Sequence, residues 1–222
     1  MSDKPIKILK NVFLSTNANQ IKIVDIKFAD RVEKIIDRTA NEIDWNEINS
    51  AEKRNKLVQQ IKESEYPSGT KIYEGEFRVL IPGGIDSHVH FNTPGFEDRD
   101  DFEHGSTSAA FGGVTTVIDM PCTSLPPVTN KNNFEAKLNA LKNRSLVDYS
   151  FYGGVCGNDF DNNINIEEQI KDLTNKGVAA FKTYLISGMS TFTDLDEERI
   201  LHTAKWIKNT NKPMAVHAEN KK

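Results

Sequence analysis

The feature that most limits the possible folds of this 222-residue chain is a repeated alternation of apolar runs and helix-like segments after Gly83. Each unit is a short apolar run, a loop and a helix-like segment, as is typical of βα units. The predicted strands are 84–90, 113–121, 147–155, 177–185 and 213–220, and the predicted helices are 99–111, 131–143, 166–176 and 194–209. Apolar strands alternating with amphipathic helices indicate parallel strands covered by helices, hence a doubly wound sheet or a barrel.

Polar residues at the carboxyl ends of these predicted strands distinguish the two folds. The residues at or near strand ends are His88, His90, Asp119, Lys182 and His217. In a (β/α) barrel, the carboxyl ends of the strands form the face on which active sites are built. We therefore expect an α/β fold of the (β/α) TIM-barrel type, with the first five strands of the barrel in residues 81–222.

The first eighty residues are organised differently. Residues 6–14 and 20–30 alternate apolar and polar side chains like half-buried strands, and residues 70–82 resemble a third strand. Residues 45–65 are rich in charge, with Leu57, Val58 and Ile61 at helical spacing and Ser50 as a candidate N-cap. The sequence thus predicts a small β-rich domain over residues 1–80, with a charged, solvated helix inserted between its strands.

Composition and charge exclude several classes of partner. The chain has 28 Lys and Arg against 32 Asp and Glu, a net charge of -4, so we do not expect a nucleic-acid partner. The first residues lack the apolar core of a signal peptide, and no apolar run is long enough to cross a bilayer. We expect a cytoplasmic protein with no membrane partner. Cys122 and Cys156 form no C-x-x-C pair, which argues against a disulfide framework or a thiolate zinc site.

Two histidines stand one residue apart where the first predicted barrel strand ends, in the segment IPGGIDSHVHFNTPG. Side chains at i and i+2 of a strand project to the same side, so His88 and His90 present two imidazoles to one point in space. This is a geometry suited to metal ligands. The alternative is a pair of hydrogen-bonded histidines, and Asp86 is either an acceptor for a ligating imidazole or a loop-capping carboxylate.

Lys182, in the apolar segment VAAFKTYL, is hard to explain structurally. Burying an unpaired ammonium costs several kcal/mol or lowers its pKa by up to roughly 3 to 5 units. A neutral amine can add carbon dioxide to become a carbamate, whose two oxygens can bridge divalent ions about 3.5 to 4 Å apart. The alternative is a lysine that reaches the rim and forms a salt bridge. His217 ends another apolar strand and can bind the second ion, whereas His104 and His202 are expected on helix surfaces.

Several of these motifs together resemble a known family. The segment GGIDSHVHFNTPGFEDRDDFEHGSTSAAFGGVTTVIDMPCTSLPP, with FKTYL and AVHAEN, is similar to the cyclic amidohydrolases: dihydroorotases, allantoinases and hydantoinases. The resemblance implies that His88 and His90 bind one zinc ion, that carboxylated Lys182 bridges two ions, and that His217 binds the second. It also implies a distorted TIM barrel beside a small β-domain. Two such ions make hydroxide available near neutral pH and polarise the amide carbonyl. Zinc is the expected metal, although manganese, cobalt, nickel or iron could occupy such a site.

The substrate-contacting positions of the family carry unusual residues here. Dihydroorotases have an Arg shortly after the paired histidines and an Asn after the Met-Pro of the second strand; these positions hold Asn92 and Cys122, our candidate substrate-binding residues. Hydantoinases have a Tyr beyond the bridging lysine, where Ser187 stands. The segments HVHFNTPG and MPCTSLPP most resemble allantoinases, although Cys122 and Thr123 replace a Leu-Asn pair. We expect a small cyclic amide or ureide as substrate, with dihydroorotase of pyrimidine biosynthesis as the alternative.

Members of this family are about twice as long as this chain, and their second half supplies another histidine ligand and the catalytic aspartate. No catalytic base is therefore assigned, and the aspartate is expected beyond the carboxyl terminus. Three explanations remain open: a truncated enzyme, a chain completed by a second polypeptide or a homo-oligomer, and a non-catalytic metal-binding subunit or remnant. A metallohydrolase for phosphoesters or lactones is a further alternative, since it would share the metal ligands.

Overall fold

The computed structural model describes residues 5–219, and the chain divides into two compact units, Met1–Pro82 (unit 1) and Gly83–Lys222 (unit 2). Unit 1 contains a sheet in the order β3-β2-β1-β5, with β4 paired to β2 and β6 paired to β1. Its strands are β1 (Lys7–Asn17), β2 (Gln20–Phe28), β3 (Val32–Asp37), β4 (Ile43–Asp44), β5 (Lys71–Glu74) and β6 (Val79–Leu80). Strand β2 is antiparallel to β1, β3 and β4, whereas β5 and β6 run parallel to β1.

Two features of unit 1 differ from the sequence-based expectation. The predicted third strand, 70–82, is broken into β5 and β6, because Glu76 and Phe77 adopt left-handed backbone conformations with φ of 52° and 55°. Strand β3 was not predicted. Five of its six side chains are exposed, so it lacks the alternation of buried and exposed residues that marks a half-buried strand.

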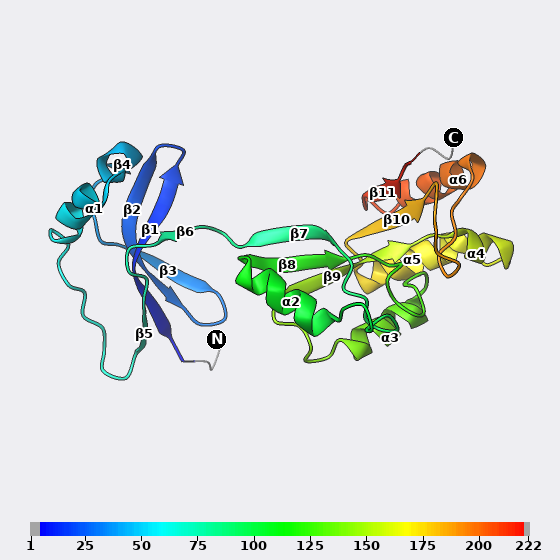
Figure 1. The fold of residues 1–222 in the computed structure, drawn as a ribbon, viewed down its shortest axis with the longest axis horizontal. Helices are drawn as coiled ribbons and strands as arrows, with labels where there is room; N and C mark the ends of the chain where they lie inside the picture. Colours follow the sequence, from blue (N-terminus) through cyan, green and yellow to red (C-terminus); the bar gives the residue numbers. More distant parts are fainter. Residues whose placement is uncertain (1–4, 220–222) are drawn as a thin grey trace. The chain divides into compact units, whose positions relative to one another are not determined.

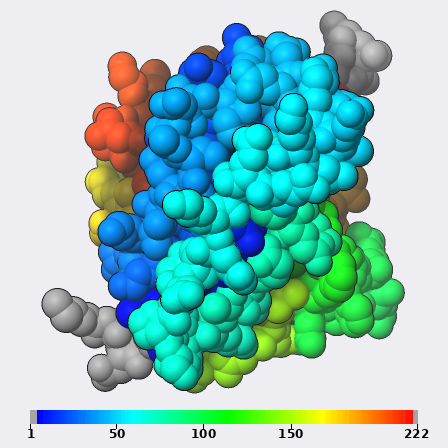
Figure 2. Space-filling view, turned by 90° about the vertical axis from the view of Figure 1, so that its left-hand side faces the viewer, coloured from blue at the N-terminus to red at the C-terminus, as the bar shows by residue number. Residues whose placement is uncertain are grey.

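The charged segment of unit 1 forms a short helix, α1 (Ala51–Val58), preceded by a 3-10 turn, η1 (Trp45–Ile48). Ser50 is the N-cap, as predicted, and its hydroxyl accepts a hydrogen bond of 3.3 Å from the Lys53 amide. None of the α1 residues is buried, and the helix lies at the surface in the space-filling view (Figure 2). Only Leu57 of α1 packs against the apolar cluster beneath the sheet.

Unit 2 is built on a parallel sheet in which neighbouring strands follow one another in chain order, β7-β8-β9-β10-β11 (Figure 1). These strands are β7 (Gly84–Val89), β8 (Val114–Asp119), β9 (Asp148–Gly154), β10 (Ala180–Tyr184) and β11 (Met214–His217). A doubly wound sheet reverses its strand order at a switch point, whereas a barrel adds each strand to the same edge. The described strands are added to one edge throughout, so the fold is a partial (β/α) barrel. Residue 220 of the last predicted strand lies outside the described residues.

The helices of unit 2 pack on one face of this sheet. They are α2 (Phe102–Phe111), α3 (Lys131–Ala140), α4 (Gly157–Asp161), α5 (Ile166–Lys176) and α6 (Glu197–Lys208). Phe102, Phe134, Leu173 and Ile207 from four helices share one buried cluster with strand residues such as Phe181. The short helix α4 was not predicted, because a single turn offers too few residues for a helical period. No helix within residues 5–219 has the length and apolar character needed to span a membrane.

Alternation along the strands sends a second set of side chains to the opposite face of the sheet. Val89, Val117, Phe151 and Phe181 face the helices. Because strand neighbours alternate, His88, His90, Lys182, Tyr184 and His217 therefore lie on the face that the helices leave free, which we call the inner face. The fold thus presents four of the five polar residues predicted near strand ends on one face. Asp119 is the exception, because it is buried on the helix side, where it pairs with Lys137.

Candidate metal centre

The paired histidines lie at the end of β7. The ring centroids of His88 and His90 are 5.3 Å apart, and both residues are exposed, while Val89 between them is buried in the helix-facing core. Asp86, within β7, accepts at its carboxylate a hydrogen bond of 3.0 Å from the His88 amide. Neighbouring protein groups partly desolvate the imidazole of His90, although the residue as a whole is exposed; this desolvation, followed by the charge of His88, lowers its pKa and favours the neutral form that ligates metals.

Lys182 is buried in the middle of β10, with an exposed fraction of 4%. Among residues 5–219 no carboxylate lies within ion-pairing distance of its ammonium; the nearest described partner is the ring of Tyr184, whose centroid lies 5.2 Å from Nζ. Burial lowers the pKa of Lys182. The salt bridge that would explain this lysine structurally is therefore not found in the described part of the chain.

His217 ends β11, beside Tyr184 in the ladder that joins β10 to β11. The His217 and Tyr184 ring centroids are 5.0 Å apart, with 31° between the ring planes. On its other side, Nε2 of His217 lies 3.5 Å from a carboxylate oxygen of Glu219. The imidazole is partly exposed, and so it remains accessible from the inner face.

The two predicted substrate-binding residues differ in their surroundings. Asn92 is half-buried in the loop after β7, has a left-handed φ of 56°, and accepts a hydrogen bond of 3.0 Å at its carbonyl from the Phe96 amide. Cys122 is buried, with its sulfur 3.1 Å from the Tyr184 hydroxyl and 4.0 Å from Nδ1 of His90. Burial raises the pKa of the Cys122 thiol. Its role as a substrate contact stays a prediction.

A buried ion pair supports the strand ends from the helix side, and sequence reasoning missed it. Lys137 of α3 is fully buried and pairs with Asp119 at the end of β8, and it also donates a 2.8 Å hydrogen bond to Ser124. The second carboxylate oxygen of Asp119 accepts a hydrogen bond of 2.9 Å from the Phe91 amide, one residue after His90. Asp119 therefore fixes the backbone that carries the paired histidines.

The donor set on the inner face suits divalent ions. Imidazoles are ligands for zinc and related metals. Lys182, on the same face, is buried without an anionic partner among the described residues, which is costly for a free ammonium. A second group of possible donors, Asp100, Asp101 and His104, gathers at the start of α2. Asp101 is the N-cap of that helix and accepts hydrogen bonds from the amide and the ring of His104, so capping accounts for this cluster.

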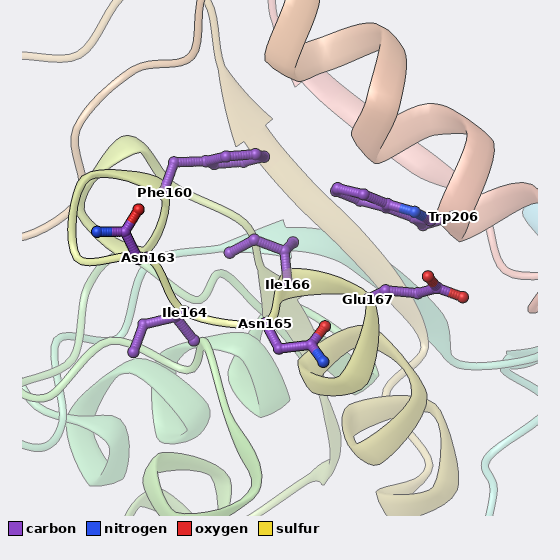
Figure 3. A pocket seen from close by; sticks show the side chains of 7 residues that line it. All are labelled: Phe160, Asn163, Ile164, Asn165, Ile166, Glu167 and Trp206. Carbon is purple, nitrogen blue, oxygen red and sulfur yellow. The ribbon is translucent and has the colours of Figure 1, made fainter.

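A surface pocket of about 370 Å³ lies between the α4–α5 connection and α6 (Figure 3). Phe160 and Trp206 form its aromatic part, with ring centroids 6.3 Å apart, and Asn163, Asn165 and Glu167 supply polar groups. None of the predicted metal ligands lines this pocket. We therefore place the candidate site at the strand ends and not in this hollow.

Comparison with known families identifies the class to which this fold and donor set correspond. Residues 79–222 match the model of the amidohydrolase family, and the chain belongs to that family. Among curated relatives, it is 34% identical over 159 residues to an allantoinase of Streptomyces avermitilis, covering 71% of this chain and 34% of the relative. It is 33% identical over 167 residues to a dihydroorotase of Methanosarcina acetivorans, covering 75% and 34% of the two chains. A mitochondrial allantoinase of Aquarana catesbeiana is 39% identical over 154 residues, covering 68% and 30%.

Solved structures show the same fold. The L-hydantoinase of Arthrobacter aurescens superposes with a TM-score of 0.74 at 24% identity, over 96% of this chain and 40% of that one. These matches confirm the predicted partial TIM barrel preceded by a β-rich segment, and the family assignment confirms the resemblance. The chain spans about a third of the length of the curated relatives it matches. Those relatives are named as hydrolases of cyclic amides, the enzyme class that the sequence predicted.

Proposed function

We propose that this chain carries the binuclear metal site of a cyclic amide hydrolase. In this proposal His88 and His90 hold the first divalent ion, His217 holds the second, and carboxylated Lys182 bridges them. Zinc is the proposed metal. The neutral amine of Lys182 would attack the carbon of carbon dioxide. The C–N bond forms as the electron pair of one C=O π bond moves to oxygen, and one proton passes from nitrogen to solvent, which gives an anionic carbamate.

The observation that carries this proposal is the burial of Lys182 without an anionic partner among the described residues. A positive charge left unpaired in this way is strongly destabilising, whereas conversion to a carbamate replaces it with two oxygen ligands. His88, His90 and His217 share the inner face with it, although they come from strands at the two sides of the sheet. One face of the sheet thus carries four side chains that could bind metal ions at a shared site.

The remaining chemistry assigns roles to the residues of the chain. Two divalent ions at such a site lower the pKa of water toward neutrality and polarise the carbonyl of an amide. The lowered pKa of His90 favours the neutral imidazole. Asp119 fixes the backbone after His90 through the Phe91 amide, and Asn92 in the next position offers an amide to the substrate. We assign the proton shuttle to no residue of this chain.

For the substrate, we infer a cyclic ureide such as that of the allantoinases. The position of the dihydroorotase arginine, which grips a carboxylate, holds Asn92, whose amide cannot form the bidentate ion pair of a guanidinium. The similarity to an archaeal dihydroorotase keeps that activity as the second candidate. Hydrolysis of allantoin and of dihydroorotate by the zinc-loaded protein, compared at equal concentrations, separates the two. Turnover of neither would favour a metal-binding subunit without catalysis of its own.

Metal content per chain tests the site directly. Purified wild-type protein, expressed with bicarbonate, is expected to contain close to two zinc ions, and Lys182→Ala is expected to lose most of them. Lys205→Ala, on the exposed side of α6, is the matched lysine control, and His202→Ala is the matched histidine control for His88→Ala. One ion or none in the wild type, unchanged in Lys182→Ala, would contradict the proposal.

A further inference from the structure

Tyr184 contacts groups from three separate elements of the proposed metal site. Its hydroxyl lies 3.1 Å from the sulfur of Cys122, in the loop after β8. Its ring lies 5.2 Å from Nζ of Lys182, on the same strand, and 5.0 Å from the ring of His217, on β11. The sulfur of Cys122 in turn lies 4.0 Å from Nδ1 of His90, directly after β7. Neither Tyr184 nor Cys122 is among the proposed metal ligands.

The ring of Tyr184 is fixed on its remaining side. Phe192, which is fully buried, packs edge-on against it with ring centroids 5.4 Å apart. Phe192 in turn requires a glycine at position 154, because a Cβ there would lie 2.5 Å from its ring. Met120, Cys122 and Phe192 belong to one small buried cluster, and Tyr184 packs against it. The phenol is therefore held by packing on one face and by one hydrogen bond at its tip.

Cys122 contacts Nδ1 of His90, and if Nε2 binds the metal, Nδ1 is the nitrogen left free for a hydrogen bond. A ligating imidazole usually donates its second N–H to an acceptor, which fixes both the ring orientation and the tautomer. If Nδ1 of His90 carries the proton, the thiol sulfur is the group toward which it points, and Nε2 keeps its lone pair for a cation. Within residues 5–219, no carboxylate or carbonyl forms a hydrogen bond with this nitrogen.

We propose that Tyr184 and Cys122 form a positioning pair for the metal centre. Their shared hydrogen bond holds the sulfur against Nδ1 of His90 and holds the phenol ring between Lys182 and His217. One pair of side chains thereby fixes ligands from β7, β10 and β11. The inference rests on the proposed function for what the ligands bind, but the positioning itself exists in the metal-free chain.

Three substitutions separate the hydrogen bond from the packing. Tyr184→Phe removes one oxygen and keeps the ring, and Cys122→Ala removes the sulfur, whereas Cys122→Ser keeps a hydrogen-bonding group at that position. Tyr152→Phe is the matched control, because Tyr152 packs against the same cluster and its hydroxyl has no hydrogen-bond partner among the described residues.

Side-chain ¹⁵N spectra of the histidines report on positioning without metal. The chain contains five histidines, of which His104 and His202 lie on helix surfaces and serve as internal references. Tyr184→Phe and Cys122→Ala are expected to shift the ring resonances of His90, and Tyr184→Phe those of His217 as well. Cys122→Ser is expected to restore most of the wild-type His90 pattern, and Tyr152→Phe to leave all five unchanged. Unaltered His90 and His217 resonances in Tyr184→Phe would overturn the inference.

Zinc affinity, measured by competition with a chelator, gives the second readout. Loss of a group that orients a ligand typically weakens metal binding by about 10- to 100-fold, and we expect this range for Tyr184→Phe. Equal zinc affinity in Tyr184→Phe and wild type would also overturn the inference. If the wild type binds no zinc while the histidine resonances still respond to Tyr184→Phe, the proposed function fails and the positioning pair stands.

Discussion

Unit 1 and unit 2 each bury a charged side chain within a strand, but only the charge in unit 1 has hydrogen-bonding and ionic partners among the described residues. Asp25 on β2 is fully buried and is surrounded by donors: Arg38, the hydroxyls of Ser64 and Tyr66, and the amide of Asn11. Lys182 on β10 is almost as buried, yet no anion and no acceptor contacts its ammonium within residues 5–219. Unit 1 therefore surrounds its buried charge with hydrogen-bond donors, whereas the Lys182 ammonium of unit 2 has no such partner among the described residues.

A third buried charge shows that unit 2 can satisfy a lysine when the role is structural. Lys137 has Asp119 and Ser124 as partners and is completely enclosed. Because two buried lysines of one unit differ in this way, the unpaired state of Lys182 is not a general property of the unit. A buried, unpaired titratable group of this kind is what the proposed metal site requires, and so the contrast between the two lysines agrees with that proposal.

The largest effect is expected from breaking the structural pair. Lys137→Met leaves the Asp119 carboxylate buried without its partner, and we expect unit 2 to lose about 3 to 5 kcal/mol of unfolding free energy. Each unit contains one tryptophan, Trp45 and Trp206, so urea unfolding followed by Trp206 fluorescence in a Trp45→Phe background reports on unit 2.

Lys176→Met is the matched control for that substitution. Lys176 pairs with Glu135 at 2.6 Å, but both side chains are substantially exposed, so a loss of only about 0 to 1 kcal/mol is expected. Equal losses for Lys137→Met and Lys176→Met would show that the buried pair does not support the sheet.

An intermediate change in the unfolding free energy of unit 1 is expected when Asp25 is substituted or is protonated at low pH. Burial alone raises the pKa of Asp25, but hydrogen bonds from Tyr66, Asn11, Ser64 and Arg38 outweigh it and leave the pKa below its ordinary value of 3.8. A carboxylate with a depressed pKa contributes stability that is complete above the unfolded-state pKa and is lost as pH falls through the folded-state pKa.

Unit 1 should therefore be equally stable at pH 6 and pH 7 with respect to this group and should weaken below about pH 4. The measurement is urea unfolding by Trp45 fluorescence in a Trp206→Phe background. Asp25→Asn is expected to cost about 2 kcal/mol at pH 7 and to flatten the acid limb. An acid limb of the same steepness in Asp25→Asn would assign the pH dependence to other carboxylates.

The smallest change in unfolding free energy is expected for Lys182, because its ammonium has no charged partner among the described residues. Lys182→Met removes an unpaired buried ammonium and keeps a side chain of similar length, so unfolding free energy without metal should stay within about 1 kcal/mol of wild type or rise. The readout is again Trp206 fluorescence during urea unfolding, with zinc chelated. A loss as large as that of Lys137→Met would mean that Lys182 is a structural residue with a stabilising partner.

Much of unit 2 was predictable from sequence, because its strands appear as short apolar runs and its helices as amphipathic segments between them. The placement of His88 and His217 at or near strand ends followed from the same pattern, since the carboxyl ends of parallel strands meet at one edge. Lys182, in contrast, lies in the middle of β10. Unit 1 was less predictable. Strand β3 is exposed and charged, and the break between β5 and β6 depends on two non-glycine residues in left-handed conformations.

The supporting residues of the site carried no local signal. Lys137 lies in the segment KNNFEAKLNA, where a lysine is ordinarily a surface residue, and only the packing of α3 on the sheet directs it toward Asp119. Tyr184 resembles any aromatic residue of a buried strand. Its contact with Cys122 joins positions 62 residues apart, and no period or motif in one sequence relates them.

The strand order of unit 2 has a kinetic consequence for the candidate centre. Lys182 sits on β10, which is hydrogen-bonded on both sides, whereas His88 lies on β7 and His217 on β11, each with one neighbouring strand among the described residues. Strands with a single ladder open more readily in local fluctuations than strands with two. Amide exchange should therefore be slowest around Lys182 and faster at both margins. Within the described residues, Lys182 is therefore predicted to lie in the most slowly exchanging strand of the set, and His88 and His217 in strands that exchange faster.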